Sequence, residues 1–278
     1  MRSVLSLAFA SALVCQAVPL LAQSRTVEQT LPLNPGGALS LRATKGTVRL
    51  TAWDRADVQI RARIEATSRM SDDYAQRAVD ATQVDIDAEP NRISIRSNYE
   101  AVSATWSGWG RDSGGLPDIH YEIQAPRSLR LSLDIDRSNS TIAGFEGRIT
   151  IEADRSELRV NDVAGDVRVE IDRGGSSRFD NVRGSFSLEG DRTDIDLSLA
   201  SLTDQGRLEL DRGNARIRVA AGQPLTLRTD VERRGSFDSE LPVQITGGTE
   251  RSPEGTINGG GPTFTVVAHR ARVTLRKM

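Results

Sequence analysis

The sequence predicts an all-β protein: a parallel β-solenoid with an N-terminal β-layer and one short helix. Three observations lead to this prediction. Apolar and polar residues alternate along most of the chain, which is typical of short strands with one buried face. From residue 136 onward Asp-Arg occurs five times, with its aspartate at residues 136, 154, 172, 191 and 211, and the intervals are 18 to 20 residues. A repeat of this length indicates one solenoid coil per repeat.

The first element is residues 1–22, which we interpret as a cleaved secretory signal peptide. Arg2 precedes a short apolar run, and Ala22 is the small residue that signal peptidase requires. The run is about half of the ~20 apolar residues that span a bilayer, so we expect no transmembrane segment after cleavage. Cys15, the only cysteine, lies in this segment. The mature chain is therefore expected to be exported, to the periplasm or the cell surface, without disulfides.

Residues 26–278 are expected to form one domain, and residues 26–130 are its N-terminal β-layer. Short alternating runs separated by turn residues indicate the strands of this layer. One stretch has helical spacing instead: residues 71–82 begin at an N-cap serine and carry acids in the first turn, which predicts a short helix. Residues 100–117 are rich in serine and glycine and have no sustained period, so they predict a loop.

Two tryptophans in this predicted loop, Trp106 and Trp109, are the candidate contact residues for a ligand or partner. Exposed tryptophans stack on sugar rings or anchor protein partners. The alternative is a loop that folds back and covers an open end of the solenoid with its two aromatic rings.

Residues 131–278 are expected to form the repeat coils, of about 18–20 residues each. When the repeats are aligned on Asp-Arg, their apolar residues fall into columns that would stack inside the coils. The expected columns are Ile149, Val167, Phe186 and Leu208; Ile151, Val169, Leu188 and Leu210; and Val160, Phe179, Ile195 or Leu197, and Ile217.

The Asp-Arg pair is interpreted as the corner between two strands, because turn-forming residues follow it. A second corner is expected at the glycines at positions 147, 165, 184 and 206. Arginines would offset the repulsion between aspartates stacked at a strand spacing of about 4.8 Å. The alternative is a calcium ladder, but the chain lacks the Gly-Gly-x-Gly-x-Asp nonapeptide and places an arginine beside each aspartate. We therefore expect no metal and no cofactor.

Charge and motifs bear on two further classes of function. Acidic residues accompany the arginines throughout and the net charge is −2, so we expect no nucleic-acid binding. His120 and His269 are the only histidines, and we interpret both as ordinary strand residues. No Gly-x-Ser-x-Gly or His-Glu-x-x-His motif is present, which favours a protein that is not an enzyme. Paired carboxylates leave a carbohydrate-active enzyme as an alternative.

Four parts of the chain carry a family resemblance: "LPLNPGGALSLRATKGTVRLTAWDRADVQIRARIEA", "YEIQAPRSLRLSLDID", the Gly-x-Val-x-Val coils and "GTINGGGPTFTVVAHRARVTLRKM". Together they resemble the DUF4097 family, bacterial envelope proteins with a β-strand repeat that are often described as adhesins. The resemblance implies a β-solenoid of exported or surface-facing type, with no established catalytic residues to carry over.

The function that the sequence favours is a non-enzymatic, exported cell-envelope protein, an adhesin or surface-interaction module. A periplasmic scaffold or sensor that binds another envelope protein is the first alternative, and a carbohydrate-active enzyme is the second. The expected partner is a protein or a glycan of the cell envelope.

Overall fold

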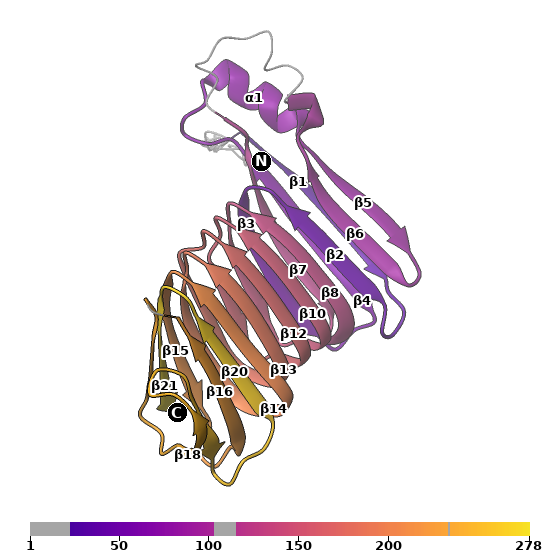
Figure 1. Cartoon of the computed structure of the whole chain (residues 1–278). Coiled ribbons are helices and arrows are strands. Elements are labelled where there is room, and N and C mark those ends of the chain that lie inside the picture. The colour runs from indigo at the N-terminus through magenta and orange to yellow at the C-terminus, as the bar shows by residue number, and fades with distance from the viewer. Residues whose placement is uncertain (1–22, 103–114, 233) are drawn as a thin grey trace, which may run out of the picture.

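The computed structural model describes residues 23–102, 115–232 and 234–278, and Figure 1 shows their arrangement. These residues form an all-β structure, in which the helix α1 (Asp72–Ala81) accompanies 21 strands of one mixed sheet. The strands are β1 (Ser24–Pro32), β2 (Ala38–Ala43), β3 (Gly46–Trp53), β4 (Asp57–Glu65), β5 (Gln83–Glu89), β6 (Arg92–Asn98), β7 (Asp118–Pro126), β8 (Ser128–Asp136), β9 (Ser138–Ala143), β10 (Glu146–Asp154), β11 (Leu158–Asn161), β12 (Ala164–Asp172), β13 (Ser176–Asp191), β14 (Asp194–Asp211), β15 (Gly213–Val219), β16 (Leu225–Val231), β17 (Ser236–Ser239), β18 (Gln244–Gly248), β19 (Pro253–Ile257), β20 (Thr263–Ala268) and β21 (Ala271–Lys277).

The strands form two faces around a shared apolar core. In face 1, hydrogen-bonded neighbours follow the order β5, β6, β2, β8, β10, β12, β13, β14, β20, β16, β19, β18. In face 2 the order is β1, β4, β7, β3, β9, β11, β13, β14, β15, β21, β17. The long strands β13 and β14 contribute one half to each face. Figure 1 shows the resulting stack, with strand β1 and its neighbours at one end and the C-terminus at the other.

The sheet is mixed, where the sequence predicted a parallel solenoid. Pairs in the middle of the stack are parallel, whereas β1–β4, β4–β7, β5–β6, β16–β19 and β18–β19 are antiparallel. The antiparallel pairs lie at the two ends of the stack, where the chain reverses direction. Strands of the predicted N-terminal β-layer continue the same sheet, because β2 and β3 pair in parallel with β8 and β9.

The apolar columns follow the register of the parallel strands, with one correction. Ile149 lies opposite Val167, which lies opposite Phe186, as predicted. Phe186, however, faces Gly206, and it is Leu188 that faces Leu208. The step from Leu202 to Gly206 on β14 covers four positions, whereas the matching step from Gly184 to Phe186 on β13 covers two. This insertion also accounts for the longer interval between the last two Asp-Arg pairs.

The third predicted column contains Leu197, the second of the two residues that the sequence allowed at this position. Val160, Phe179, Leu197 and Ile217 lie opposite one another on successive strands, and all four side chains are fully buried. Ile195 occupies the neighbouring inward position on β14. The core therefore consists of stacked rows of apolar residues, with polar side chains at the alternate, outward positions.

Glycines form the second corner at three of the four predicted positions. Gly147, Gly165 and Gly184 have φ angles of 119°, 116° and 111°, a region that side chains strongly disfavour. A β-carbon at Gly165 would also collide with the carbonyl oxygen of Gly147 in the preceding coil. Gly206 is different: its φ is not positive, and a β-carbon there would meet the ring of Phe264. It makes room for that ring instead of forming a corner.

The helix α1 lies at the N-terminal end of the stack (Figure 1). Its buried side chains include Tyr74 and Ala78, which pack with Val102 in a small second cluster. Of the predicted loop, residues 100–102 are helical and residues 115–117 are irregular, and the rest lies outside the described residues. Within the part of the chain that the structure describes, no helix is long and apolar enough to cross a membrane.

Candidate functional site

The Asp-Arg pairs form a continuous corner along one side of face 1. The sequence placed the tight turn on the residues after the pair, but the arginines themselves take the left-handed conformation. Their φ angles lie between 49° and 64° in Arg137, Arg155, Arg173, Arg192 and Arg212. A local hydrogen bond supports the turn in two coils, because the serine after the arginine donates its hydroxyl to the aspartate's carbonyl oxygen, at 3.1 Å and 2.8 Å.

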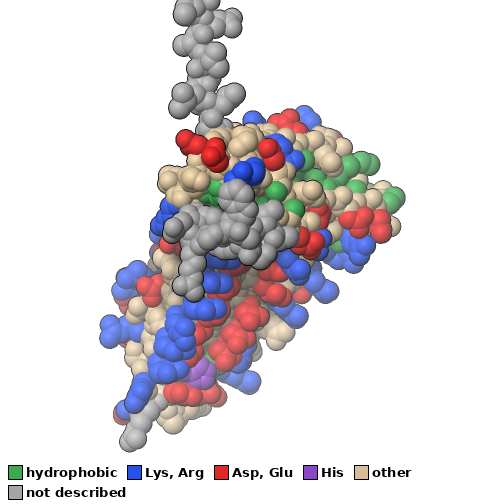
Figure 2. Space-filling view, turned by 90° about the horizontal axis from the view of Figure 1, so that it is seen from above, with side chains coloured by type: hydrophobic (Ala, Val, Ile, Leu, Met, Phe, Trp, Pro, Cys, Tyr) green, Lys and Arg blue, Asp and Glu red, His purple; other side chains and the backbone are tan. Residues whose placement is uncertain are grey.

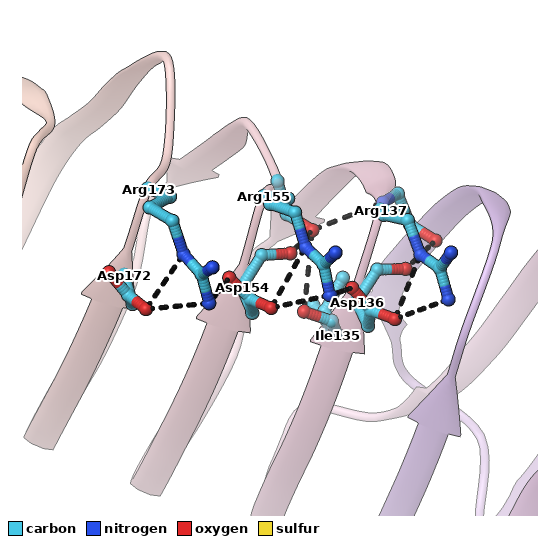
Figure 3. A network of polar contacts seen from close by, with 9 residues as sticks. Ile135, Asp136, Arg137, Asp154, Arg155, Asp172 and Arg173 are labelled. Carbon is cyan, nitrogen blue, oxygen red and sulfur yellow. Dashed lines mark hydrogen bonds and ion pairs between the residues drawn. The ribbon is translucent and has the colours of Figure 1, made fainter.

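Three of the five arginines, Arg155, Arg173 and Arg212, join two coils, and Figure 3 shows the first two of them. The side chains of Arg137 and Arg192 contact the aspartate of their own pair. Arg155 donates from Nε to Asp154 Oδ2 at 2.9 Å in its own coil and from Nη2 to Asp136 Oδ1 at 3.1 Å in the preceding coil. Arg173 repeats this arrangement with Asp172 at 2.9 Å and Asp154 at 3.0 Å. Both carboxylate oxygens of Asp154 therefore contact arginines, which is the geometry of a structural corner. We call this series of pairs the corner ladder.

At its C-terminal end, the corner ladder has a His-Arg sequence in place of Asp-Arg. Arg270, which follows a histidine instead of an aspartate, contacts both oxygens of Asp211, at 2.9 Å and 2.6 Å. Its guanidinium group lowers the pKa of the Asp211 carboxyl. The last coil thus joins the ladder with an arginine of its own, although it lacks Asp-Arg.

A second row of charges, the acidic column, runs beside the corner ladder. It consists of Glu152, Glu170, Glu189 and Glu209, which lie opposite one another on adjacent strands and point outward. Strand spacing places their backbones about 4.8 Å apart. Glu209 contacts Arg207 and His269, but no cation among the described residues pairs with the other three glutamates. Figure 2 shows acidic and basic side chains in neighbouring bands along the molecule.

His269 closes the C-terminal end of the acidic column. Its Nδ1 lies 2.8 Å from Glu232 Oε1 and its Nε2 lies 3.4 Å from Glu209 Oε1, and all three residues line a hollow of about 630 Å³. The hydrogen bond with Glu232, reinforced by Glu209, raises the pKa of His269. The pKa of the Glu209 carboxyl is lowered, mainly by its hydrogen bond with Arg207 and to a smaller extent by its hydrogen bond with His269.

His120, the other histidine, lies on face 2. Its Nδ1 is 2.9 Å from the hydroxyl of Thr47, and its Nε2 is 3.5 Å from Glu65 Oε2. The two histidines are on different faces and belong to no common site. Across the described ranges, no group of three or more His, Asp or Glu side chains is arranged to hold a metal ion.

Neither the acidic column nor the cluster around His269 was predicted from the sequence. The acidic column had a visible signal, since Glu-x-Asp-Arg occurs at four successive repeats and places each glutamate two residues before the corner. The cluster had none, because Glu209 and His269 are 60 residues apart. The predicted contact residues Trp106 and Trp109 lie outside the described residues.

Comparison with known proteins gives matches of structure only. No family model and no curated protein matches the chain. Similar solved structures include a "putative cell adhesion protein" from Clostridium sporogenes (10% identity, TM-score 0.30, 91% of this chain and 100% of that one). A "putative adhesin" from Bacteroides fragilis has 10% identity and a TM-score of 0.33, over 91% and 97% of the two chains. A "putative lipid binding protein" from Parabacteroides distasonis has 9% identity and a TM-score of 0.35, over 90% and 96%. Similarity at this level carries no argument about function.

Proposed function

We propose that the protein is a non-enzymatic, exported cell-envelope protein of the DUF4097 type: an adhesin or surface-interaction module whose parallel strands are the coils of a β-solenoid. The acidic column is the observation that carries this proposal. Like charges directly opposite each other on neighbouring strands destabilise a sheet. The fold therefore gains nothing from the three unpaired glutamates, whereas a partner protein with a lysine- or arginine-rich surface would neutralise them along a straight line.

The environment of His269 supports a non-enzymatic role. A general base needs a free ring nitrogen within reach of the proton that it removes. Both ring nitrogens of His269 face carboxylates, those of Glu232 and Glu209. His269 is thus engaged in holding the last coil to the acidic column.

Export and surface display are tested by treating intact producing cells with an external protease and following the mature chain by immunoblot. A periplasmic protein serves as the leakage control. Loss of the chain while the control survives supports surface display. Digestion that occurs only after the outer membrane is permeabilised contradicts an adhesin and favours a periplasmic scaffold or sensor.

The role of the acidic column is tested by the triple variant Glu152→Gln, Glu170→Gln and Glu189→Gln. We expect binding of the labelled mature protein to intact cells to fall at least about tenfold, and its salt dependence to flatten. A control variant with the same net charge changes three exposed glutamates elsewhere, Glu146, Glu250 and Glu254, to glutamine. Equal loss in the two variants would show that net charge, and not the acidic column, governs binding.

A further inference from the structure

A separate hollow of about 420 Å³ lies on face 1 near the N-terminal end of the stack, over β5, β6, β2 and β8. Figure 1 shows these strands side by side, away from the C-terminal end where His269 lies. The floor of the hollow is a row of small residues, since Ser94 lies opposite Ser40 and Ser40 opposite Ser132. No hydrogen bond engages these three hydroxyls within the described part of the chain. Three small side chains in register leave a depression beside the longer side chains of Arg42 and Arg96.

One wall of the hollow is a row of paired charges. Arg96 lies opposite Arg42, and Arg42 lies opposite Asp134, to which its Nε donates at 2.7 Å. At the outer end, Arg96 Nη2 donates to Asp85 Oδ2 at 2.7 Å, and Asn98 donates to the same oxygen at 3.0 Å. The hydrogen bond from Arg96 lowers the pKa of Asp85, so this carboxyl group stays ionised at neutral pH.

These contacts leave an unused hydrogen-bond acceptor on each of two carboxylates. Arg42 contacts Asp134 through Oδ2 alone, and the bonds to Asp85 also end on Oδ2. A carboxylate has two oxygens and about four acceptor sites. Asp134 and Asp85 both line the hollow, and their Oδ1 atoms have no hydrogen-bond partner among the described residues.

The charges around the hollow are nearly balanced. Asp85 and Asp134 are matched by Arg96 and Arg42, and Asp87 lies 3.9 Å from Arg92. A balanced site has no strong preference for an ionic ligand. Free acceptors, hydroxyls and guanidinium N–H groups suit a neutral molecule that carries many hydroxyl groups.

We propose that this hollow binds a neutral saccharide. Ring hydroxyls donate to Oδ1 of Asp85 and Asp134 and exchange hydrogen bonds with Ser94, Ser40 and Ser132. The volume is within the range of small-ligand sites, about 300–1,000 Å³. Rearrangement costs little, because ion pairs between exposed side chains, such as Arg42–Asp134, contribute little to stability. The site goes beyond the proposed function, although its charged wall lies in line with the acidic column, because Asp134 is opposite Glu152.

The test is isothermal titration of the mature protein with two neutral probes, the tetrasaccharides of glucose and of N-acetylglucosamine. Ser40→Leu fills the floor of the hollow with an apolar side chain. We expect the association constant of at least one probe to fall about tenfold or more in this variant, which corresponds to the loss of one or two hydrogen bonds. The matched control is Thr141→Leu, an outward position on face 2, which should change the constant less than about twofold.

Absence of binding by both tetrasaccharides, or equal loss of binding in both variants, would overturn the saccharide site. Circular dichroism checks that each variant retains its strand content. The same variants in the cell-binding assay separate the two proposals. Ser40→Leu protein that adheres normally while failing to bind either probe supports the saccharide site and leaves the acidic column as the adhesive surface.

Discussion

Glu170 provides a direct test of the acidic column, because neutralising it should stabilise the protein. Glu170 lies between Glu152 and Glu189 and has no cationic partner among the described residues. Two carboxylates about 5 Å apart in water repel by about 0.8 kcal/mol, and like charges on facing strand positions cost about 0.2–1 kcal/mol. Relief of two such contacts by Glu170→Gln should raise the free energy of unfolding by about 1 kcal/mol. For a domain of this size, that corresponds to about 2–4 °C in Tm.

The assay is thermal unfolding followed by circular dichroism at 20 mM and 500 mM NaCl. Glu146→Gln is the matched control, because Glu146 is exposed on β10 and faces the uncharged Ser128 and Ala164. Salt screens repulsion between exposed charges, so the gain from Glu170→Gln should shrink at 500 mM NaCl. A Tm for Glu170→Gln equal to or below that of the control at low salt would refute the repulsion argument.

Three further predictions concern the corners and the last coil. The pKa of His269 is raised in the folded state. The stabilisation that protonated His269 provides is therefore complete below the unfolded pKa of about 6.5 and is lost as pH rises through the folded pKa. The Tm advantage of the native protein over His269→Gln should be larger at pH 6 than at pH 8. Gly165→Ala should destabilise by at least about 2 kcal/mol or prevent folding, whereas Gly222→Ala, also at positive φ but in open space, should cost only about 1 kcal/mol in urea unfolding. Asp154→Asn weakens the partly exposed contacts with Arg155 and Arg173, and its cost should be below about 2 kcal/mol by the same measurement.

Repetition made much of the architecture predictable from the sequence. Asp-Arg aligns consecutive coils because each pair occupies the same corner, and the apolar residues before it then fall into register. The error at Leu208 has a local cause: the extra residues of β14 lie between Leu202 and Gly206, and two extra residues leave the alternation of inward and outward side chains unchanged. Period-two alternation therefore gave no sign of this shift.

Other features depend on pairings that alternation does not specify. A strand with one buried face has the same pattern in parallel and antiparallel pairs, so the antiparallel ends of the stack were not predicted. Left-handed arginines in the corner were equally unexpected, because this conformation is costly for residues other than glycine and asparagine. Arg155, one of these left-handed arginines, forms ion pairs with aspartates of two coils, Asp154 and Asp136.

The offset of the corner ladder has a consequence for how the chain can lengthen. Arg155 reaches back to Asp136, and Asp154 is contacted in turn by Arg173 of the following coil, so these repeats carry one half of each of two similar joints. A duplicated 18-residue unit, such as 155–172, would bring its own complementary halves and could be inserted without redesigning its neighbours. Each added unit would extend the stack by about 4.8 Å. Tandem duplication can thus adjust the reach of such a protein in uniform steps.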